Sequence, residues 1–438
     1  MIADNSRATS SVLSLAVPAL VVLAAEPLYL LVDTAVVGNL GTVPLGGLAV
    51  GGGLLAWAAG LLNFLAYGTT ARAARRAGAG DRAGAVAEGV QATWLALALG
   101  LAALAAFQVL AGPLTELLAG GPGPVATAGE EWLRIASLGV PLLLVSLAGN
   151  GWLRGVQELR RPVRYVLAGS LVSVVLCPLL VYAAGLGLAG SAVANVVGQA
   201  VAAALFLRAL ARERVGWRPR PAAVRAQLVI GRDLLLRAAV LQVSFLAAAG
   251  VAARAGTVPL AAHQIALQLF FFLALVLDAY AIAAQTLVGQ ALGRGAPEAA
   301  RTTARRVAVW GLGTGTVVGL LLIVLRNALL PLFTDDPAVV AQAEVAWWFL
   351  AAMQPLAGVV FALDGVLMGA GDVGYLRTVT IGSALLGFLP LSLLALPLGW
   401  GLAGVWSGLT LFIVLRLVGV ALRVAGDHWL RAPDTVKA

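Results

Sequence analysis

Two acidic residues stand inside the first long apolar segment of the chain, where a charged side chain is costly. The run EPLYLLVDTAVVG begins at Glu26 and contains Asp33. A carboxylate near the middle of a bilayer costs roughly 2.5–3.5 kcal/mol on insertion scales, so it normally faces a protein interior or a water-filled cavity. Their spacing corresponds to about two helical turns, so the two acids project from nearly the same helix face. The spacing predicts that both acids look into one cavity; the alternative is that a neighbouring helix merely tolerates them.

Other polar residues lie in apolar segments further along the chain. Asp278 in ALVLDAYAIAAQ and Asp364 in FALDGVLMGAGD stand deep in segments of the C-terminal half. We expect each to serve a cavity or the coupling of two fluxes, with simple helix packing as the alternative. Ser173, Cys177 and Asn195, taken alone, are typical of polar groups that pack membrane helices together.

Aromatic residues are also candidates for a binding pocket. Tyr29, Trp57 and Phe361 could line a pocket for large apolar or cationic compounds through their ring faces. Residues of this kind more often face lipid or the protein core, and that alternative stays open.

The elements that must position these residues are membrane helices. Of 438 residues, 61% are hydrophobic and only 11% are charged, which is typical of a polytopic membrane protein. About 20 apolar residues are needed for each crossing. Charged or Gly/Pro-rich breaks divide the chain into twelve such segments: 11–38, 44–70, 86–111, 132–153, 163–184, 187–207, 233–253, 258–290, 307–329, 338–368, 377–397 and 400–422.

The distribution of arginine predicts the orientation, because Lys and Arg accumulate in cytoplasmic loops. Arginines cluster after the second, fourth, sixth and eighth segments, whereas the alternate loops hold only Arg134, Arg254 and Arg326. We therefore expect a multi-pass protein of the inner or plasma membrane with both termini in the cytoplasm. The net charge of +9 sits beside apolar helices, so anionic lipid headgroups are the expected partner rather than nucleic acid.

Few residues are suited to catalysis or metal binding. The chain has one cysteine and two histidines, which excludes an intramolecular disulfide and a Cys-based zinc cluster. We expect no enzyme activity, no metal and no cofactor. The first apolar run continues into Asp33 without a small-residue cleavage site, which predicts a retained first helix.

The two halves of the chain are repeats. At an offset of 215 residues, GTVPL at 41–45 recurs at 256–260, and Asn63 aligns with Asp278; at an offset of 214, GLAG at 187–190 recurs at 401–404. Six crossings in each half make the repeats parallel, and transporters built in this way bind between their halves. The predicted organisation is an N-terminal lobe at 1–210, a cytoplasmic linker at 211–232 and a C-terminal lobe at 233–438.

Five stretches of the sequence carry a resemblance that extends over nearly the whole chain. They are PLYLLVDTAVVGNLG (27–41), GWLRGVQELRRPV (151–163), AAHQIA (261–266), VLDAYAIAAQTLVGQALG (276–293) and ALDGVLMGAGD (362–372). These stretches closely resemble multidrug and toxic compound extrusion (MATE) transporters of the DNA-damage-inducible F branch. The resemblance implies an all-α membrane protein with two six-helix lobes around a central cleft, alternating access, and efflux driven by inward flow of H⁺ or Na⁺.

In the N-terminal half the resemblance concerns four residues, and the chain departs from the family's pattern at two of them. Asp33 matches the first-helix aspartate that takes up the coupling ion. Relatives usually place Asn and Asp in the fifth helix, where this chain has Ser173 and Cys177. A polar partner in the sixth helix falls near Asn195.

In the C-terminal half the resemblance is less complete. Asp364 matches a tenth-helix acid that other branches use to bind cations. The seventh-helix glutamate that accompanies this acid is replaced by Gln242. Asp278 matches an acid typical of the branch.

The sequence thus predicts an antiporter that exports amphipathic or cationic small molecules. Protons are the expected coupling ion, because Na⁺ wants several oxygen ligands. The alternatives are a flippase for lipid-linked precursors with the same superfold, which needs a cationic cleft, and a membrane-embedded enzyme. We expect a monomer. The predicted coupling residues are Asp33, Glu26, Ser173, Cys177, Asn195, Asp278 and Asp364, and the predicted substrate cleft contains Tyr29, Trp57, Asn63, Gln242 and Phe361.

Overall fold

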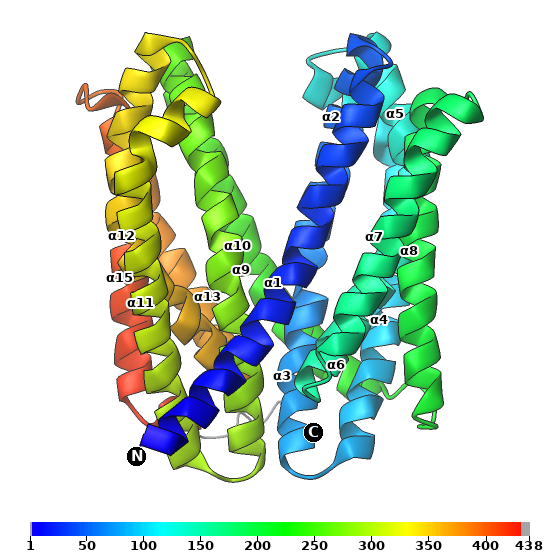
Figure 1. The fold of residues 1–438 in the computed structure, drawn as a ribbon, viewed down its shortest axis with the longest axis vertical. Coiled ribbons are helices and arrows are strands. Elements are labelled where there is room, and N and C mark those ends of the chain that lie inside the picture. The colour runs from blue at the N-terminus through cyan, green and yellow to red at the C-terminus, as the bar shows by residue number, and fades with distance from the viewer. Residues whose placement is uncertain (1, 431–438) are drawn as a thin grey trace. The chain divides into compact units, whose positions relative to one another are not determined.

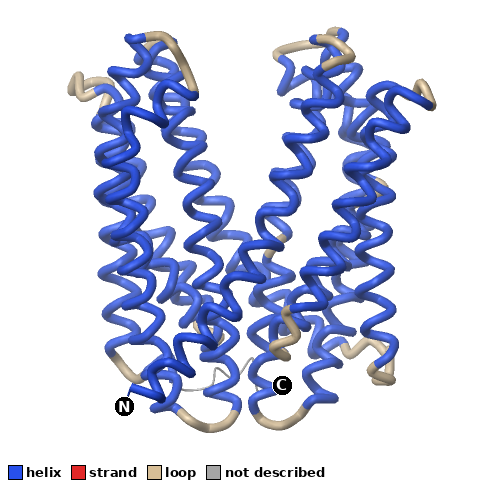
Figure 2. The backbone as a smooth tube through the Cα atoms, in the orientation of Figure 1, coloured by secondary structure: helices blue, strands red, loops and turns tan. Residues whose placement is uncertain are grey.

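The computed structural model describes residues 2–430, with side chains from Leu15 onward. Within these residues every regular element is a helix, and no strand is present (Figures 1 and 2). The α-helices are α1 (Ile2–Gly38), α2 (Thr42–Leu62), α3 (Phe64–Gly78), α4 (Arg82–Ala119), α5 (Pro124–Ser137), α6 (Val140–Gly155), α7 (Arg160–Pro178), α8 (Gly187–Arg212), α9 (Pro221–Ala255), α10 (Thr257–Gly293), α11 (Pro297–Leu329), α12 (Pro337–Ala370), α13 (Val373–Ser383), α14 (Leu389–Leu394) and α15 (Gly401–Ala425). Short π or 3₁₀ turns are η1 (Leu179–Ala183), η2 (Leu330–Leu332), η3 (Ala384–Phe388) and η4 (His428–Leu430).

The helices account for the twelve predicted crossings. Eleven spans in the described part of the chain are long and apolar enough to cross a membrane. The twelfth is the pair α5 and α6, which is bent by 50° at its break and corresponds to the segment predicted at 132–153. The prediction of an all-α membrane protein with twelve crossings is therefore confirmed.

The chain divides into two compact units. One unit comprises residues 17–231, and the other comprises the described residues from Arg232 onward together with the beginning of α1. The division falls between Gly231 and Arg232, so all but the last residue of the linker predicted at 211–232 group with the N-terminal unit.

Small residues let the helices of the N-terminal unit approach closely. Helix α6 packs against α3, α4 and α8, while α7 packs on α8. A Cβ added to Gly151 would come within 2.6 Å of the Ala66 carbonyl oxygen, and one added to Gly169 would come within 2.6 Å of the Gly198 carbonyl oxygen. Larger residues at these positions would push the helices apart.

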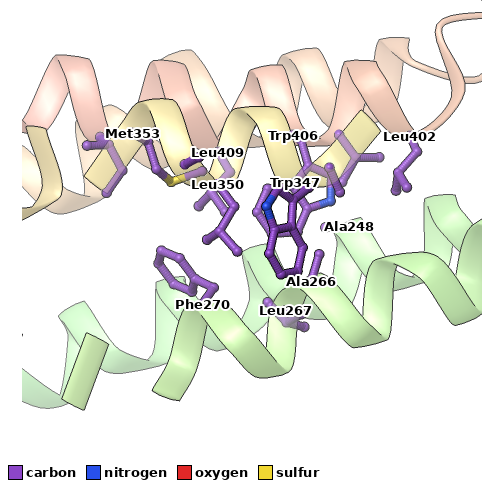
Figure 3. Packing of buried hydrophobic residues seen from close by; sticks show 14 of the residues in the cluster. Ala248, Ala266, Leu267, Phe270, Trp347, Leu350, Met353, Leu402, Trp406 and Leu409 are labelled. Carbon is purple, nitrogen blue, oxygen red and sulfur yellow. The ribbon is translucent and has the colours of Figure 1, made fainter. Parts of the chain in front are cut away.

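Helix α12 is the centre of the C-terminal unit. It packs against α10, α11 and α15, and 72% of its apolar span is buried. Figure 3 shows the Trp347 ring of α12 facing α10, near Leu267 and Phe270. The Trp347 indole donates a hydrogen bond to the Leu322 carbonyl at 2.8 Å, which satisfies its polar group inside this core.

Candidate functional site

Asp33 lies near the C-terminal end of α1 and is fully buried in the N-terminal unit. The Cys177 thiol of α7 donates a hydrogen bond to its Oδ1 at 3.2 Å, while Oδ2 has no hydrogen-bond partner among the described residues. Ser191 of α8 also lies beside the carboxyl group, and its hydroxyl accepts a hydrogen bond from the Trp132 indole at 3.1 Å. Helices α1, α7 and α8 thus meet at this one acid.

The chemistry around Asp33 suits a carboxyl group that binds and releases a proton. In the described part of the chain no arginine or lysine pairs with Asp33. Burying a charged group without a charged partner costs far more than burying a neutral one, whereas a protonated carboxyl is neutral and carries its own donor. The thiol of Cys177 is a weak donor and a soft ligand, so it does not supply a hard oxygen of the kind that an alkali or alkaline-earth cation needs.

A cavity of about 130 Å³ lies in the same unit, next to this acid. Its walls come from α1, α2, α5, α6, α7 and α8, and its polar lining includes Glu26, Tyr29, Asn150, Ser173, Asn195 and Gln199. This volume is enough for several water molecules, since one water needs roughly 10–15 Å³ on the same measure. The cavity can therefore hydrate the polar side chains that line it.

Glu26 and Asp33, which we predicted to share one face of α1, lie in different surroundings. Glu26 is exposed and lines the cavity, whereas Asp33 is not part of the lining. Tyr29 lies between them on α1, is 5% exposed and also lines the cavity. The expectation that both acids look into the same cavity is wrong for Asp33. Tyr29 stands about one helical turn before Asp33, so it lines the cavity next to the buried acid.

Close packing of α7 and α8 places two of the predicted polar residues at the cavity. The Ser173 hydroxyl donates to the Ala194 carbonyl at 3.1 Å, and both Ser173 and Asn195 line the cavity wall. Beyond Cys177, the Tyr182 hydroxyl of η1 donates to the Val36 carbonyl at 2.5 Å, which ties η1 to the end of α1. The Tyr182 and Cys177 contacts thus tie η1 and α7 to the end of α1, and the Ser173 contact ties α7 to α8.

The residues predicted for a substrate cleft do not gather at this cavity, apart from Tyr29. Trp57 is 53% exposed and is not part of the lining, and Asn63 marks the break between α2 and α3. Gln242 lies half-buried in α9, and Phe361 of α12 packs against the core of the C-terminal unit. Hydropathy could not indicate which way these side chains point.

Asp364 of α12 lies in a different chemical setting from the one predicted. Its Oδ2 accepts hydrogen bonds from Arg237 of α9 and from Arg416 of α15, and both contacts are ion pairs. A carboxylate held by two guanidinium groups is not free to bind a cation, so the structure argues against a C-terminal cation site at Asp364. Asp278 of α10 is half-buried and takes part in interactions of its own.

Sequence reasoning missed both arginines. Arg416 stands alone in the apolar run LTLFIVLRLVGVAL, and Arg237 follows an arginine-rich segment that we assigned to a loop. The signal was present, because an arginine inside a membrane span is as unusual as an acid. Among residues 2–430 no group of three or more His, Cys, Asp or Glu could hold a metal ion.

Three comparisons with known proteins, by family model, by sequence and by structure, agree with one another. The MatE family model matches the chain twice, at residues 18–179 and 234–393, in agreement with the internal repeat. The chain is 32% identical over 427 residues to the chloroplastic Protein DETOXIFICATION 44 of Arabidopsis thaliana, covering 94% of this chain and 81% of the relative. It is 32% identical over 428 residues to the DNA damage-inducible protein F of Escherichia coli (strain K12), covering 92% of this chain and 89% of the relative. A crystal structure of MATE in the bent conformation shares the fold, with a TM-score of 0.88, 22% identity and 95% coverage of each chain.

Proposed function

Because this chain belongs to the MatE family of membrane transporters, we propose that it is a proton-coupled antiporter with Asp33 as the proton carrier. The exported substrates are amphipathic or cationic small molecules, and transport proceeds by alternating access. The observation that carries the proposal is the buried Asp33 carboxyl group, whose Oδ1 accepts a hydrogen bond from the Cys177 thiol and whose Oδ2 has no partner in the part of the chain that the structure describes.

The choice of the proton over sodium rests on the atoms around Asp33. A hard cation such as Na⁺ binds several oxygen ligands at once, by analogy with Ca²⁺ and Mg²⁺. Here Cys177 supplies sulfur, and the Ser173 hydroxyl is already directed at the Ala194 carbonyl. A proton needs only one carboxyl oxygen, and Oδ2 is available.

The cavity supplies the route between water and Asp33. Water held beside Glu26, Tyr29 and Asn195 can accept the proton that the carboxyl group releases. A proton taken up from the outside neutralises Asp33, and its loss to the inside restores the charge. The two fluxes are coupled when the charged and neutral states of Asp33 bind substrate with different affinities.

The test is export of ethidium, an amphipathic cation, by the full chain in proteoliposomes. A pH gradient without sodium should drive export, and a sodium gradient without a pH difference should not. Asp33→Asn fixes the neutral state, so ethidium binding persists while pH-driven export falls to background. The exposed Glu116→Gln is the matched control and should export like the wild type. Export driven by sodium alone, or full pH-driven export by Asp33→Asn, contradicts the proposal.

The orientation with both termini in the cytoplasm is part of the same proposal. It is supported by the arginine-rich connections after the second, fourth, sixth and eighth crossings. In this orientation Asp33 takes up its proton from the extracellular ends of α1, α7 and α8, and the cavity at Glu26 lies on its cytoplasmic side along α1.

A further inference from the structure

Three charged side chains in the C-terminal unit form a cluster that the proposed proton route does not use. Arg237, Asp364 and Arg416 come from α9, α12 and α15, and together they carry one formal positive charge in excess. Asp364 is 2% exposed and Arg416 is 4% exposed. Buried charges are normally paired, so an excess positive charge at this depth favours an additional anionic group.

The cluster also has unused hydrogen-bonding capacity. Each guanidinium group carries five N–H donors, yet both arginines donate to the same oxygen, Oδ2 of Asp364. The Nε of Arg416 and the Oδ1 of Asp364 have no partner among the described residues. The side chain of Arg237 keeps 16% of its surface exposed, so the cluster is not sealed on that side.

An aromatic ring borders the same guanidinium group. The Cζ of Arg416 lies 5.2 Å from the centroid of the Phe412 ring. Stacking on a ring covers one face of a guanidinium and leaves its N–H edge for hydrogen bonding. The edge geometry of arginine matches a carboxylate or a phosphate group in two parallel hydrogen bonds.

From these observations we propose that the Arg237–Asp364–Arg416 cluster is a binding site for the carboxylate or phosphate group of a small anion. When no anion is bound, the Asp364 carboxylate accepts hydrogen bonds from both arginines in place of the ligand. The bound anion accepts hydrogen bonds from Arg416 Nε and from the donors of both arginines that Asp364 leaves unused. The proposal concerns binding alone and does not depend on proton coupling at Asp33.

A purely structural role makes a different prediction for Asp364. If the cluster only clamps three helices together, Asp364→Asn weakens the clamp and has no reason to strengthen the binding of any anion. If Asp364 competes with a ligand, the same change removes the competing charge, while the amide oxygen still accepts a hydrogen bond. The sign of the effect of Asp364→Asn on anion binding therefore separates the two roles.

The experiment measures binding of radiolabelled benzoate and of inorganic phosphate to the purified full chain in detergent at low chloride. Tighter binding of benzoate identifies a carboxylate site, and tighter binding of phosphate identifies a phosphate site. Loss of a charged hydrogen bond changes affinity on the order of tenfold or more. We expect Arg416→Gln to weaken binding by about that factor, Arg416→Lys to weaken it less because its charge is retained, and Asp364→Asn to tighten it by a similar factor.

Asp335→Asn is the matched control, because it removes an exposed acid of the same unit that lies outside the cluster. It should leave anion binding unchanged, and all variants are checked for folding by gel filtration and thermal unfolding. If Arg416→Gln does not fold, Arg416→Lys and Asp364→Asn carry the test. The proposal is overturned if neither anion binds saturably, if Asp364→Asn does not tighten binding, or if Asp335→Asn tightens it equally.

Discussion

The two units carry different side chains at the repeat positions around their polar groups. At the sequence offsets of 215 and 214 residues, Asp33 corresponds to Ala248, and Asn195 corresponds to Leu409. Ala248 and Leu409 belong to the apolar core of the C-terminal unit, where they are 0% and 3% exposed. The hydrogen-bonded surroundings of the buried acid in one unit are thus replaced by close apolar packing in the other.

The reverse holds for the charged cluster. Arg237, Asp364 and Arg416 correspond to Val22, Asn150 and Ala202 in the N-terminal unit. All three counterparts line the cavity. Long charged side chains therefore stand in the C-terminal unit at the repeat positions where the N-terminal unit has small or neutral residues around open space. The same arrangement of helices can therefore hold a hydrated cavity in one repeat and an ion cluster at the equivalent positions of the other.

Leucine substitutions at the equivalent positions 364 and 150 should differ most in their effect on the free energy of unfolding. Asp364→Leu leaves two buried arginines without their carboxylate, and removing one partner of a buried ion pair costs about 3–5 kcal/mol. Asn150→Leu removes only a neutral amide at the cavity wall, and it should cost under about 1 kcal/mol. Thermal and denaturant unfolding in detergent measures both changes. Equal losses would show that the charge cluster does not distinguish the units.

A smaller effect is expected from asparagine at position 409. Leu409→Asn removes apolar contacts and buries an amide in the core of the C-terminal unit, which should cost about 2–4 kcal/mol. The amide of its counterpart Asn195 lies at the cavity, so Asn195→Leu should lower stability by less than about 1 kcal/mol. The same unfolding measurements apply. If Leu409→Asn left the stability unchanged, position 409 would not require the apolar packing that we assign to the core of the C-terminal unit.

The smallest perturbation tests whether the repeats are parallel. Thr42 and Thr257 begin α2 and α10 at equivalent positions, and both are exposed. In a Cys177→Ser background, Thr42→Cys and Thr257→Cys should both react with a membrane-impermeant maleimide from outside, while Ala79→Cys should react only after the cells are opened. Neither change should alter export, provided that Cys177→Ser alone still transports. Labelling of the two threonine positions from opposite sides would rule out parallel repeats.

The sequence by itself determined the class of fold and the number of crossings. Both follow from the hydropathy of neighbouring residues, since the apolar length of a segment and the breaks between segments do not depend on distant residues. The internal repeat and the special status of Asp33 were also evident, because the cost of an intramembrane acid is a property of that residue and the bilayer. The bend between α5 and α6 did not disturb this count, because the two helices together still supply one crossing.

Only the tertiary structure decided which polar groups meet. Arg416 lies 52 residues from Asp364, and Arg237 lies 127 residues from it, so the ion pairs depend on how α9, α12 and α15 are rotated and packed. In the N-terminal unit, the rotation and packing of α1, α2 and α7 likewise leave Trp57 exposed, bury Asp33 beside Cys177 and turn Glu26 towards the cavity. Hydropathy along one helix does not contain these rotations, because they are chosen by the close packing of small residues on neighbouring helices.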